Sequence, residues 1–309
     1  MNYAIVFENP NPAPIVNCKE SLLGKSMLSY ILTHLSQVKI DKTICMVDVK
    51  DFFLFPKAEQ EMPCSMKQIA DMMDLLKEDG FTLFIPANVL FLDAEGINGL
   101  LTVHKNNYHS LTLGTMLFHR PFGYARVKRK NRRVISVVEE EHATAAEKLI
   151  NEVSSGIFCV NHKVLKSFLL SGKSSFIDLI QYVSKTYKVD TYMFTDKARG
   201  ICDVKDLVLA EERIREQICD TWLKRGVRLE NPKTVLIGPE VIIEERVTIF
   251  SNTRILGKTR IHKGARIGPN TTIENSIICK DVWIRDSIVE DSRIKEGTIV
   301  GPFAVKLGN

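Results

Sequence analysis

Long hydrophobic runs and paired cysteines are both absent from this sequence. No apolar stretch approaches the ~20 residues that a membrane-spanning helix needs, so the sequence predicts no membrane span. The seven cysteines lie scattered, without the paired spacing of a zinc site or a disulfide framework. The N-terminal residues run directly into an apolar segment and lack the pattern of a signal peptide. We therefore expect a reduced, cytoplasmic protein without a membrane partner.

A strong excess of one charge is also absent, since the net charge is +5 over 309 residues. One basic cluster precedes a run of glutamates at 139–141, and no aromatic residues are interleaved with it as a single-stranded nucleic-acid platform requires. The cluster therefore predicts a solvated hairpin turn rather than a nucleic-acid partner. Its members are Arg126, Lys128, Arg129, Lys130, Arg132 and Arg133.

What the sequence does contain is a period of six residues within 235–306. Neither a helix nor an ordinary strand has this period, whereas a parallel β-helix does, because each side of its coil contributes one six-residue unit. A β-sandwich would instead show alternation over a few residues. The isoleucines that hold the phase are Ile237, Ile243, Ile249, Ile255, Ile261, Ile267 and Ile273. Two residues before them lie small or β-branched residues, namely Val235, Val241, Val247, Thr253, Thr259, Ala265 and Thr271.

The period slips after Ile273, and we expect it to resume with inward residues at Ile288, Ile294 and Val300. Glycines and prolines are expected to turn the corners of the coil. The outward residues Phe250, Leu256 and Trp283 have no evident partner within the chain and are candidates for a contact between subunits.

Strand and helix signals alternate in the first part of the chain, which favours an α/β domain with a largely parallel sheet. Expected strands cover 3–7, 43–47, 82–85 and 156–160, with a hairpin at 124–138. Expected helices cover 28–38, 66–77, 143–150, 164–170 and 176–187, together with one that Asp93 caps. A long helix at 203–225 ends at Gly226. We predict an α/β domain at 1–202, a connector helix at 203–226 and a β-helix at 227–309.

Four short motifs occur in the order and near spacing of a known family. They are Gly123-Tyr124-Ala125-Arg126-Val127, Val137-Val138-Glu139, Ala143-Thr144, and Glu152-Val153-Ser154-Ser155-Gly156-Ile157. They resemble G-Y-G-R-I, I-V-E, D-A-T and E-I-N-T-G-I of the bacterial bifunctional N-acetylglucosamine-1-phosphate uridyltransferase/glucosamine-1-phosphate acetyltransferase family. The resemblance implies a nucleotide-diphospho-sugar transferase-like, Rossmann-like domain followed by a short left-handed parallel β-helix, here in a C-terminally truncated member.

The resemblance also implies transfer of a uridylyl group from UTP to a sugar phosphate, with Mg²⁺ as cofactor. The family's glycine-rich phosphate loop falls on residues 7–14, which contain no glycine and three prolines, each lacking an N–H donor. Glu8 would repel phosphate there, and the lysine that follows the loop falls on Asn17, unless Lys19 serves instead. The base-recognition loop falls on residues 62–68. These changes predict weak or absent binding of the nucleotide.

The metal ligands and the sugar contacts differ in how well they are preserved. The resemblance implies that the metal-binding aspartate is replaced by Asn88 and a second ligand by Cys202. It also implies that Gly123 and Glu139 contact the sugar, with Ser154 in place of an asparagine. The acetyl-transfer site of the family lies in later coils, beyond the sequence at hand.

Three functions stay open at this point. The first is an active but divergent nucleotidyltransferase that makes a nucleotide sugar for cell-envelope synthesis, with Lys19 or Lys25 at the phosphate and Asp93 at Mg²⁺. The second is a UDP-N-acetylglucosamine pyrophosphorylase-like protein with impaired or lost catalysis, which binds a sugar phosphate or nucleotide sugar and has a regulatory role. The third is a trimeric β-helix scaffold without ligand. Function has to be argued from the site, and the lost phosphate and metal positions favour the second of these functions. We expect the protein to form a homotrimer through the β-helix.

Overall fold

The computed structural model describes residues 1–8, 20–46, 58–61, 79–106, 110–173, 175–195, 198–201 and 203–308, with 58–61 described by backbone alone. The helix expected at 66–77 lies outside these ranges. The chain forms two compact units. The first comprises Met1–Glu20 and Met27–Asp203, and the second comprises Ser21–Ser26 and Val204–Asn309.

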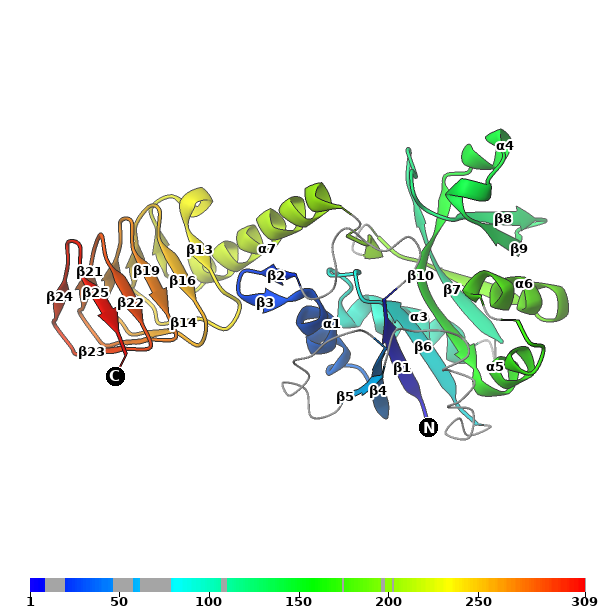
Figure 1. Cartoon of the computed structure of the whole chain (residues 1–309), viewed down its shortest axis with the longest axis horizontal. Helices are drawn as coiled ribbons and strands as arrows, with labels where there is room; N and C mark the ends of the chain where they lie inside the picture. The colour runs from blue at the N-terminus through cyan, green and yellow to red at the C-terminus, as the bar shows by residue number, and fades with distance from the viewer. Residues whose placement is uncertain are drawn as a thin grey trace. The chain divides into compact units, whose positions relative to one another are not determined.

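A mixed sheet forms the centre of the first unit, in the order β11-β7-β10-β6-β1-β4-β5 (Figure 1). Its strands are β1 (Tyr3–Phe7), β4 (Lys42–Met46), β5 (Ala58–Glu61), β6 (Phe81–Pro86), β7 (Leu111–Leu117), β10 (Glu152–Asn161) and β11 (Val189–Met193). Strand β10 runs antiparallel to both of its neighbours, β6 and β7, whereas the other neighbouring pairs are parallel. The antiparallel hairpin of β8 (Arg126–Lys130) and β9 (Arg133–Val138) joins this sheet through β10.

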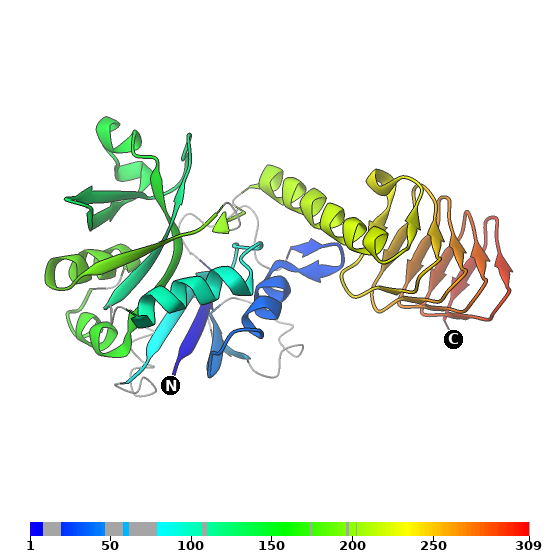
Figure 2. The same cartoon turned by 180° about the vertical axis from the view of Figure 1, so that it is seen from behind.

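Helices cover both faces of this sheet, so its central strands are buried on both sides. Along β1, Ala4 and Val6 belong to one apolar core and Ile5 and Phe7 to the other, as the two-residue period of a strand requires. Helices α1 (Met27–Leu35) and α3 (Ala94–Asn106) contribute to the first core, and α5 (His162–Leu169) and α6 (Phe176–Thr186) to the second. Figure 2 shows α3 in front of the sheet.

Local signals account for the ends of several of these elements. The Asp93 carboxylate accepts the Gly96 N–H at 2.9 Å, which caps α3 as predicted. At the tip of the β8–β9 hairpin, Asn131 and Arg132 both have positive φ, the conformation that suits a tight hairpin turn. Two short helical segments follow the hairpin, the 3-10 helix η3 (Glu140–His142) and α4 (Ala145–Lys148).

The second unit contains α7 (Val204–Lys224), which ends at Gly226 in the left-handed conformation as predicted, and a stack of three parallel sheets. Among the described residues, no helix combines the length and hydropathy needed to cross a membrane. The first sheet consists of β12 (Arg228–Leu229), β15 (Thr248–Ile249), β18 (Arg266–Ile267), β21 (Trp283–Ile284) and β24 (Ile299–Val300). The second consists of β13 (Leu236–Ile237), β16 (Arg254–Leu256), β19 (Thr272–Glu274), β22 (Ile288–Glu290) and β25 (Val305–Leu307). The third consists of β14 (Ile242–Ile243), β17 (Arg260–Ile261), β20 (Ile277–Ile278) and β23 (Arg293–Ile294).

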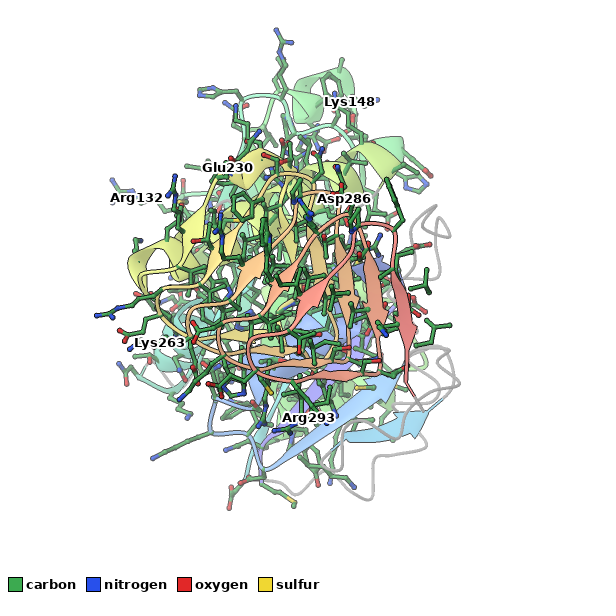
Figure 3. All side chains as sticks on the ribbon, turned by 90° about the vertical axis from the view of Figure 1, so that its left-hand side faces the viewer. Arg132, Lys148, Glu230, Lys263, Asp286 and Arg293 are labelled. Carbon is green, nitrogen blue, oxygen red and sulfur yellow. The ribbon has the colours of Figure 1, made fainter. Side chains whose placement is uncertain are left out.

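These sheets form a left-handed parallel β-helix. The six-residue period predicts the parallel coil, and the family resemblance implies its left hand. Each inward residue pairs with its equivalent in the next coil, as Ile255 does with Ile237 and Ile273. The isoleucines at these positions are buried and form one continuous apolar core. In Figure 3 the charged side chains of Lys263, Asp286 and Arg293 lie on the outside of the coil.

The irregular part of the coil differs from the prediction. Val289 is fully buried, whereas Ile288 is 41% exposed, so the expected inward position of Ile288 is wrong. Five residues, rather than six, separate Ile273 from Ile278 and Ile284 from Val289. Asparagine and aspartate take the left-handed conformation at the shortened corners, which lets the strands keep their register. Corners therefore depend on these residues as well as on glycine and proline.

All three of the outward apolar residues have partners within the chain, contrary to expectation. Leu256 is buried beneath the hairpin of β2 (Ser21–Leu22) and β3 (Lys25–Ser26), where a Cβ on Gly24 would lie 3.9 Å from its Cδ2. The guanidinium carbons of Arg266 and Arg285 lie 4.9 and 5.0 Å from the Trp283 ring centre. Phe250 also contacts Arg266, at 5.6 Å.

Candidate functional site

The candidate site lies where β1 and β6 end. In sheets with parallel strands, ligands bind at the carboxyl ends of the strands. The Ala87 N–H donates to the Phe7 carbonyl at 2.7 Å, which joins the ends of these two strands. Strand β10 crosses the same region with an irregular register between Ser154 and Phe158. Gly156 takes a positive φ of 77° here, and a Cβ on it would lie only 2.8 Å from Pro86 Cγ, so glycine is required.

The structure brings the three predicted sugar-contact positions onto neighbouring elements. Gly123 shortly precedes β8 and Glu139 directly follows β9, and the adjoining ends of these two strands pair with each other. The Ser154 N–H donates to the Ala125 carbonyl at 2.9 Å, which joins β10 to the same end of the hairpin. Gly123, Glu139 and Ser154 therefore gather at the end of the hairpin that is opposite its turn.

Each of these positions presents a group that suits a polyhydroxylated ligand. Gly123 has a φ of 77°, and among the described atoms none lies within 4 Å of where its Cβ would be, so its backbone is open to close approach. The Glu139 side chain is 53% exposed, and its carboxylate lies 3.4 Å from His142 Nδ1. The Ser154 hydroxyl accepts the Gly156 N–H at 3.2 Å and keeps its own proton to donate.

Ion pairs hold the β8–β9 hairpin to the segments around it. Two of them, between Lys128 and Glu147 and between Arg129 and Glu152, are partly exposed. Hydrogen bonding from Lys128, followed by Thr144, lowers the pKa of Glu147 to about 2. The Arg129 guanidinium donates twice to Glu152, at 2.6 Å each, and this hydrogen bonding raises the pKa of Arg129.

Arg126 is the member of the basic cluster that departs from the predicted solvated turn. It is only 1% exposed, while Lys130, Arg132 and Arg133 are exposed as expected. Its guanidinium forms an ion pair of 2.5 Å with Glu140 and also donates to the Tyr124 carbonyl. This role was not predicted from the sequence, although the acidic run directly after β9 indicated that a basic partner lay nearby.

The two predicted metal positions lie on segments that contact each other. The Asn88 side-chain amide donates to the Ile201 carbonyl at 3.1 Å, and the Ile201 N–H donates to the Asn88 carbonyl at 2.9 Å. Cys202 follows directly but lies outside the described residues. Gly200 packs so closely that a Cβ on it would lie 2.9 Å from Asn88 Nδ2. The structure thus brings the Asn88 side chain against the segment that carries the second position.

The described residues do not fit a bound Mg²⁺. This ion prefers carboxylate oxygens in octahedral geometry, whereas Asn88 is neutral and its amide nitrogen is bonded to Ile201. Within the part of the chain that the structure describes, no group of three or more histidine, cysteine, aspartate or glutamate residues could hold a metal ion. We therefore derive no chemical step from a metal.

The substitute residues considered for an active enzyme have other contacts. Asp93 caps α3. Lys25 lies in β3, which belongs to the second unit, where burial lowers its pKa and the charge of Glu240 opposes that shift. Lys19 and Asn17 lie outside the described residues, as do residues 62–68 and most of the 7–14 segment, so their expected roles stay predictions.

Comparison with known proteins finds no matching family model. Curated relatives are named bifunctional protein GlmU. The relative from Acholeplasma laidlawii (strain PG-8A) is 34% identical over 302 residues, which cover 92% of this chain and 66% of the relative. The relative from Carboxydothermus hydrogenoformans is 32% identical over 238 residues, covering 74% and 53%. The relative from Staphylococcus haemolyticus (strain JCSC1435) is 30% identical over 301 residues, covering 91% and 67%. The chain thus spans about two thirds or less of their length.

Proposed function

Because this chain belongs to the family of the bifunctional protein GlmU, a nucleotidyltransferase family, we propose that it binds a sugar phosphate or nucleotide sugar without efficient nucleotidyl transfer. Its role in this proposal is regulatory rather than catalytic. The single observation that carries the proposal is the contrast between Asn88 and the sugar-contact positions. The neutral Asn88 amide is bonded to Ile201, whereas the exposed Gly123 and Glu139 lie close to the half-buried Ser154.

The chemistry of nucleotidyl transfer explains why this contrast matters. The reaction needs a cation and fixed donors to neutralise the charge that develops on the phosphates. An asparagine in the metal position supplies no negative charge to hold Mg²⁺. Sugar hydroxyls need only hydrogen-bond partners, and an exposed carboxylate such as Glu139 accepts strong bonds from them. Loss of the Mg²⁺ ligand therefore leaves the hydrogen-bond partners of the sugar in place.

Calorimetric titration of the full chain tests this proposal with N-acetylglucosamine 1-phosphate, UDP-N-acetylglucosamine and UTP, each with and without Mg²⁺. We expect a sugar-containing ligand to bind and UTP to show no Mg²⁺-dependent binding. Glu139→Ala should weaken binding of the sugar ligand, while Glu141→Ala, which removes an exposed carboxylate two residues further along the chain, in η3, should not. Micromolar UTP affinity that requires Mg²⁺, together with pyrophosphate release, would overturn the proposal.

Assembly as a homotrimer through the β-helix is a second part of the proposal. Exposed apolar residues on the outer positions of the coil support it, namely Ile242, Ile288, Ile299, Val305 and Leu307. Closed cyclic symmetry buries such faces without growing a filament. Light scattering of the full chain should give three times the 35.0 kDa of one chain, and a monomer would end this part of the proposal. A chain that ends at Arg225 should be monomeric.

We also retain the expected domain division at 1–202, 203–226 and 227–309, with the ligand bound in the first part and assembly through the last.

A reducing, cytoplasmic setting belongs to the same proposal. Its support is the state of the described cysteines, of which Cys45, Cys159 and Cys219 are free and buried. Burial raises the pKa of the Cys45 thiol to about 12, so it is inert toward disulfide exchange.

A further inference from the structure

We propose that Arg126 is a positioning residue, which fixes the backbone at Gly123 and the carboxylate of Glu139 relative to each other. This inference rests on the proposed function, because it concerns the same sugar-contact positions. It adds a residue that does not itself touch the ligand and explains why a charged side chain is buried beside an otherwise exposed site.

The contacts of Arg126 reach both sides of the site. One terminal nitrogen of the guanidinium donates to the Tyr124 carbonyl, in the residue that follows Gly123. The other pairs with the Glu140 carboxylate at 2.5 Å, in the residue that follows Glu139. A single buried side chain thus connects the turn before β8 with the turn after β9.

Each turn also has contacts of its own, and the Tyr124 ring packs against Phe118 with 5.2 Å between the ring centres. The Tyr124 N–H donates to the Pro121 carbonyl at 3.3 Å, and the His142 N–H donates to the Glu139 carbonyl at 3.1 Å. Gly123 has a positive φ, and its Cβ position has no described atom within 4 Å, so side-chain packing does not hold it. Glycine also has more backbone freedom than any other residue. Each of these contacts involves one turn only, whereas Arg126 contacts both.

Arginine suits this role better than other residues. Its planar guanidinium carries five donors in a fixed geometry, so one group can bond a carbonyl and a carboxylate at the same time. Because Arg126 is 1% exposed, water competes little with its hydrogen bond to Tyr124 or with its ion pair to Glu140. Lysine would keep the positive charge but, as a compact point charge, could not hold both partners in the same geometry.

The alternative is an ion pair that merely stabilises the unit, and the same hairpin offers a matched control. Arg129 also forms an ion pair, with Glu152, but it contacts neither turn of the site. Arg126→Met and Arg129→Met therefore each remove one arginine of the hairpin, and only the first removes a connection between Gly123 and Glu139.

Amide hydrogen exchange on the full chain tests the positioning without any ligand. In Arg126→Met, the amides of Tyr124 and His142 should exchange about tenfold faster or more, while those of β10 keep their protection. Arg129→Met should leave both turns unchanged. Unchanged exchange at the two turns in Arg126→Met would overturn the proposal. So would a uniform acceleration across the first unit with a lowered melting temperature, since that outcome marks a purely structural role.

Titration with N-acetylglucosamine 1-phosphate then tests the effect on binding. Arg126→Met should raise the Kd for this ligand about tenfold relative to the wild type. In a protein that already carries Glu139→Ala, the same change should raise the Kd by less than about twofold, because residues that act as a unit have non-additive effects. Arg126→Lys should give a Kd between those of the wild type and of Arg126→Met. Independent, multiplying effects of the Arg126 and Glu139 changes would overturn the inference. If the wild type binds none of the probes, the proposed function fails, and the exchange measurement still decides whether Arg126 holds the two turns.

Discussion

The β-helix and the β8–β9 hairpin are both built from strands, but different interactions hold them in place. In the coil, the buried side chain of Ile255 pairs with equivalent isoleucines above and below it. In the hairpin, the buried Arg126 depends on one carboxylate and one carbonyl. Repeated apolar contacts tolerate variation, since the coil keeps its register where its sides shorten from six residues to five. A charged anchor depends on its particular partners, so a single substitution can disorder it.

The largest effect is expected in the core of the coil. Ile255→Ala should destabilise the second unit by about 4 kcal/mol, because it removes a fully buried side chain and leaves a cavity between coils. The matched change Ile288→Ala, at a partly exposed position, should cost less than about 1 kcal/mol. Both tryptophans, Trp222 and Trp283, lie in the second unit, so urea unfolding followed by their fluorescence reports on it directly. Equal losses from the two changes would contradict the assigned inward positions.

A smaller and asymmetric effect is expected in the hairpin. Glu140→Ala should destabilise the first unit by about 3 kcal/mol, because it leaves the buried Arg126 guanidinium without its counter-charge. Arg126→Met should change the free energy of unfolding of the first unit by less than about 0.5 kcal/mol, because methionine keeps the buried packing and the remaining Glu140 side chain is 24% exposed and can be hydrated. Protection of the β10 amides during urea titration measures both changes. A larger loss from Arg126→Met than from Glu140→Ala would show that burial of the arginine is not the dominant cost.

The smallest effect concerns acid pH. The Lys128 and Thr144 hydrogen bonds lower the pKa of Glu147 to about 2, while an unperturbed glutamate titrates near ~4.3. A lowered pKa in the folded state stabilises the hairpin above pH ~4.3, and this stabilisation is lost as the pH falls toward 2. Glu147→Gln should therefore flatten the pH dependence of unfolding in this window. An NMR titration in which the Glu147 carboxyl titrates near ~4.3 would contradict the prediction.

The coil offers a counterpart for this last comparison. The backbone N–H of Lys263 and then the His262 side chain lower the pKa of Glu244. Glu244→Gln should flatten the acid dependence of tryptophan fluorescence, which reports on the second unit, and leave the hairpin unchanged. Effects of Glu244→Gln on the protection of β10 would show that the two regions do not unfold independently.

Much of the fold could be predicted from the sequence because its signals are local. The six-residue period places Ile237 through Ile273 inward correctly, since each coil contacts the next one along the chain. The strands β1 and β6, the cap of α3 and the end of α7 at Gly226 also agree with the prediction. Strand β11 was missed, because it is a short edge strand that pairs with β7, far earlier in the chain.

The candidate site could be predicted only in part. The family motifs predicted Gly123, Glu139 and Ser154 as one group of positions, and the structure brings these residues together, whereas their binding of a sugar stays a proposal. The burial of Arg126 could not be read from the sequence, where it resembles its solvated neighbours. The burial of Arg126 depends on the position of the segment after β9, which places Glu140 beside its guanidinium.

The sequence by itself determined the parts whose contacts repeat along the chain, above all the coil and its inward isoleucines. Only the tertiary structure decided which polar and apolar groups are buried by residues that are distant in the sequence. Leu256 is buried because a hairpin from residues 21–26 packs on it, and the Asn88 amide is occupied by Ile201, which is 113 residues away. The physical reason is that burial depends on every neighbour in space, whereas a periodic pattern records only the neighbours along the chain.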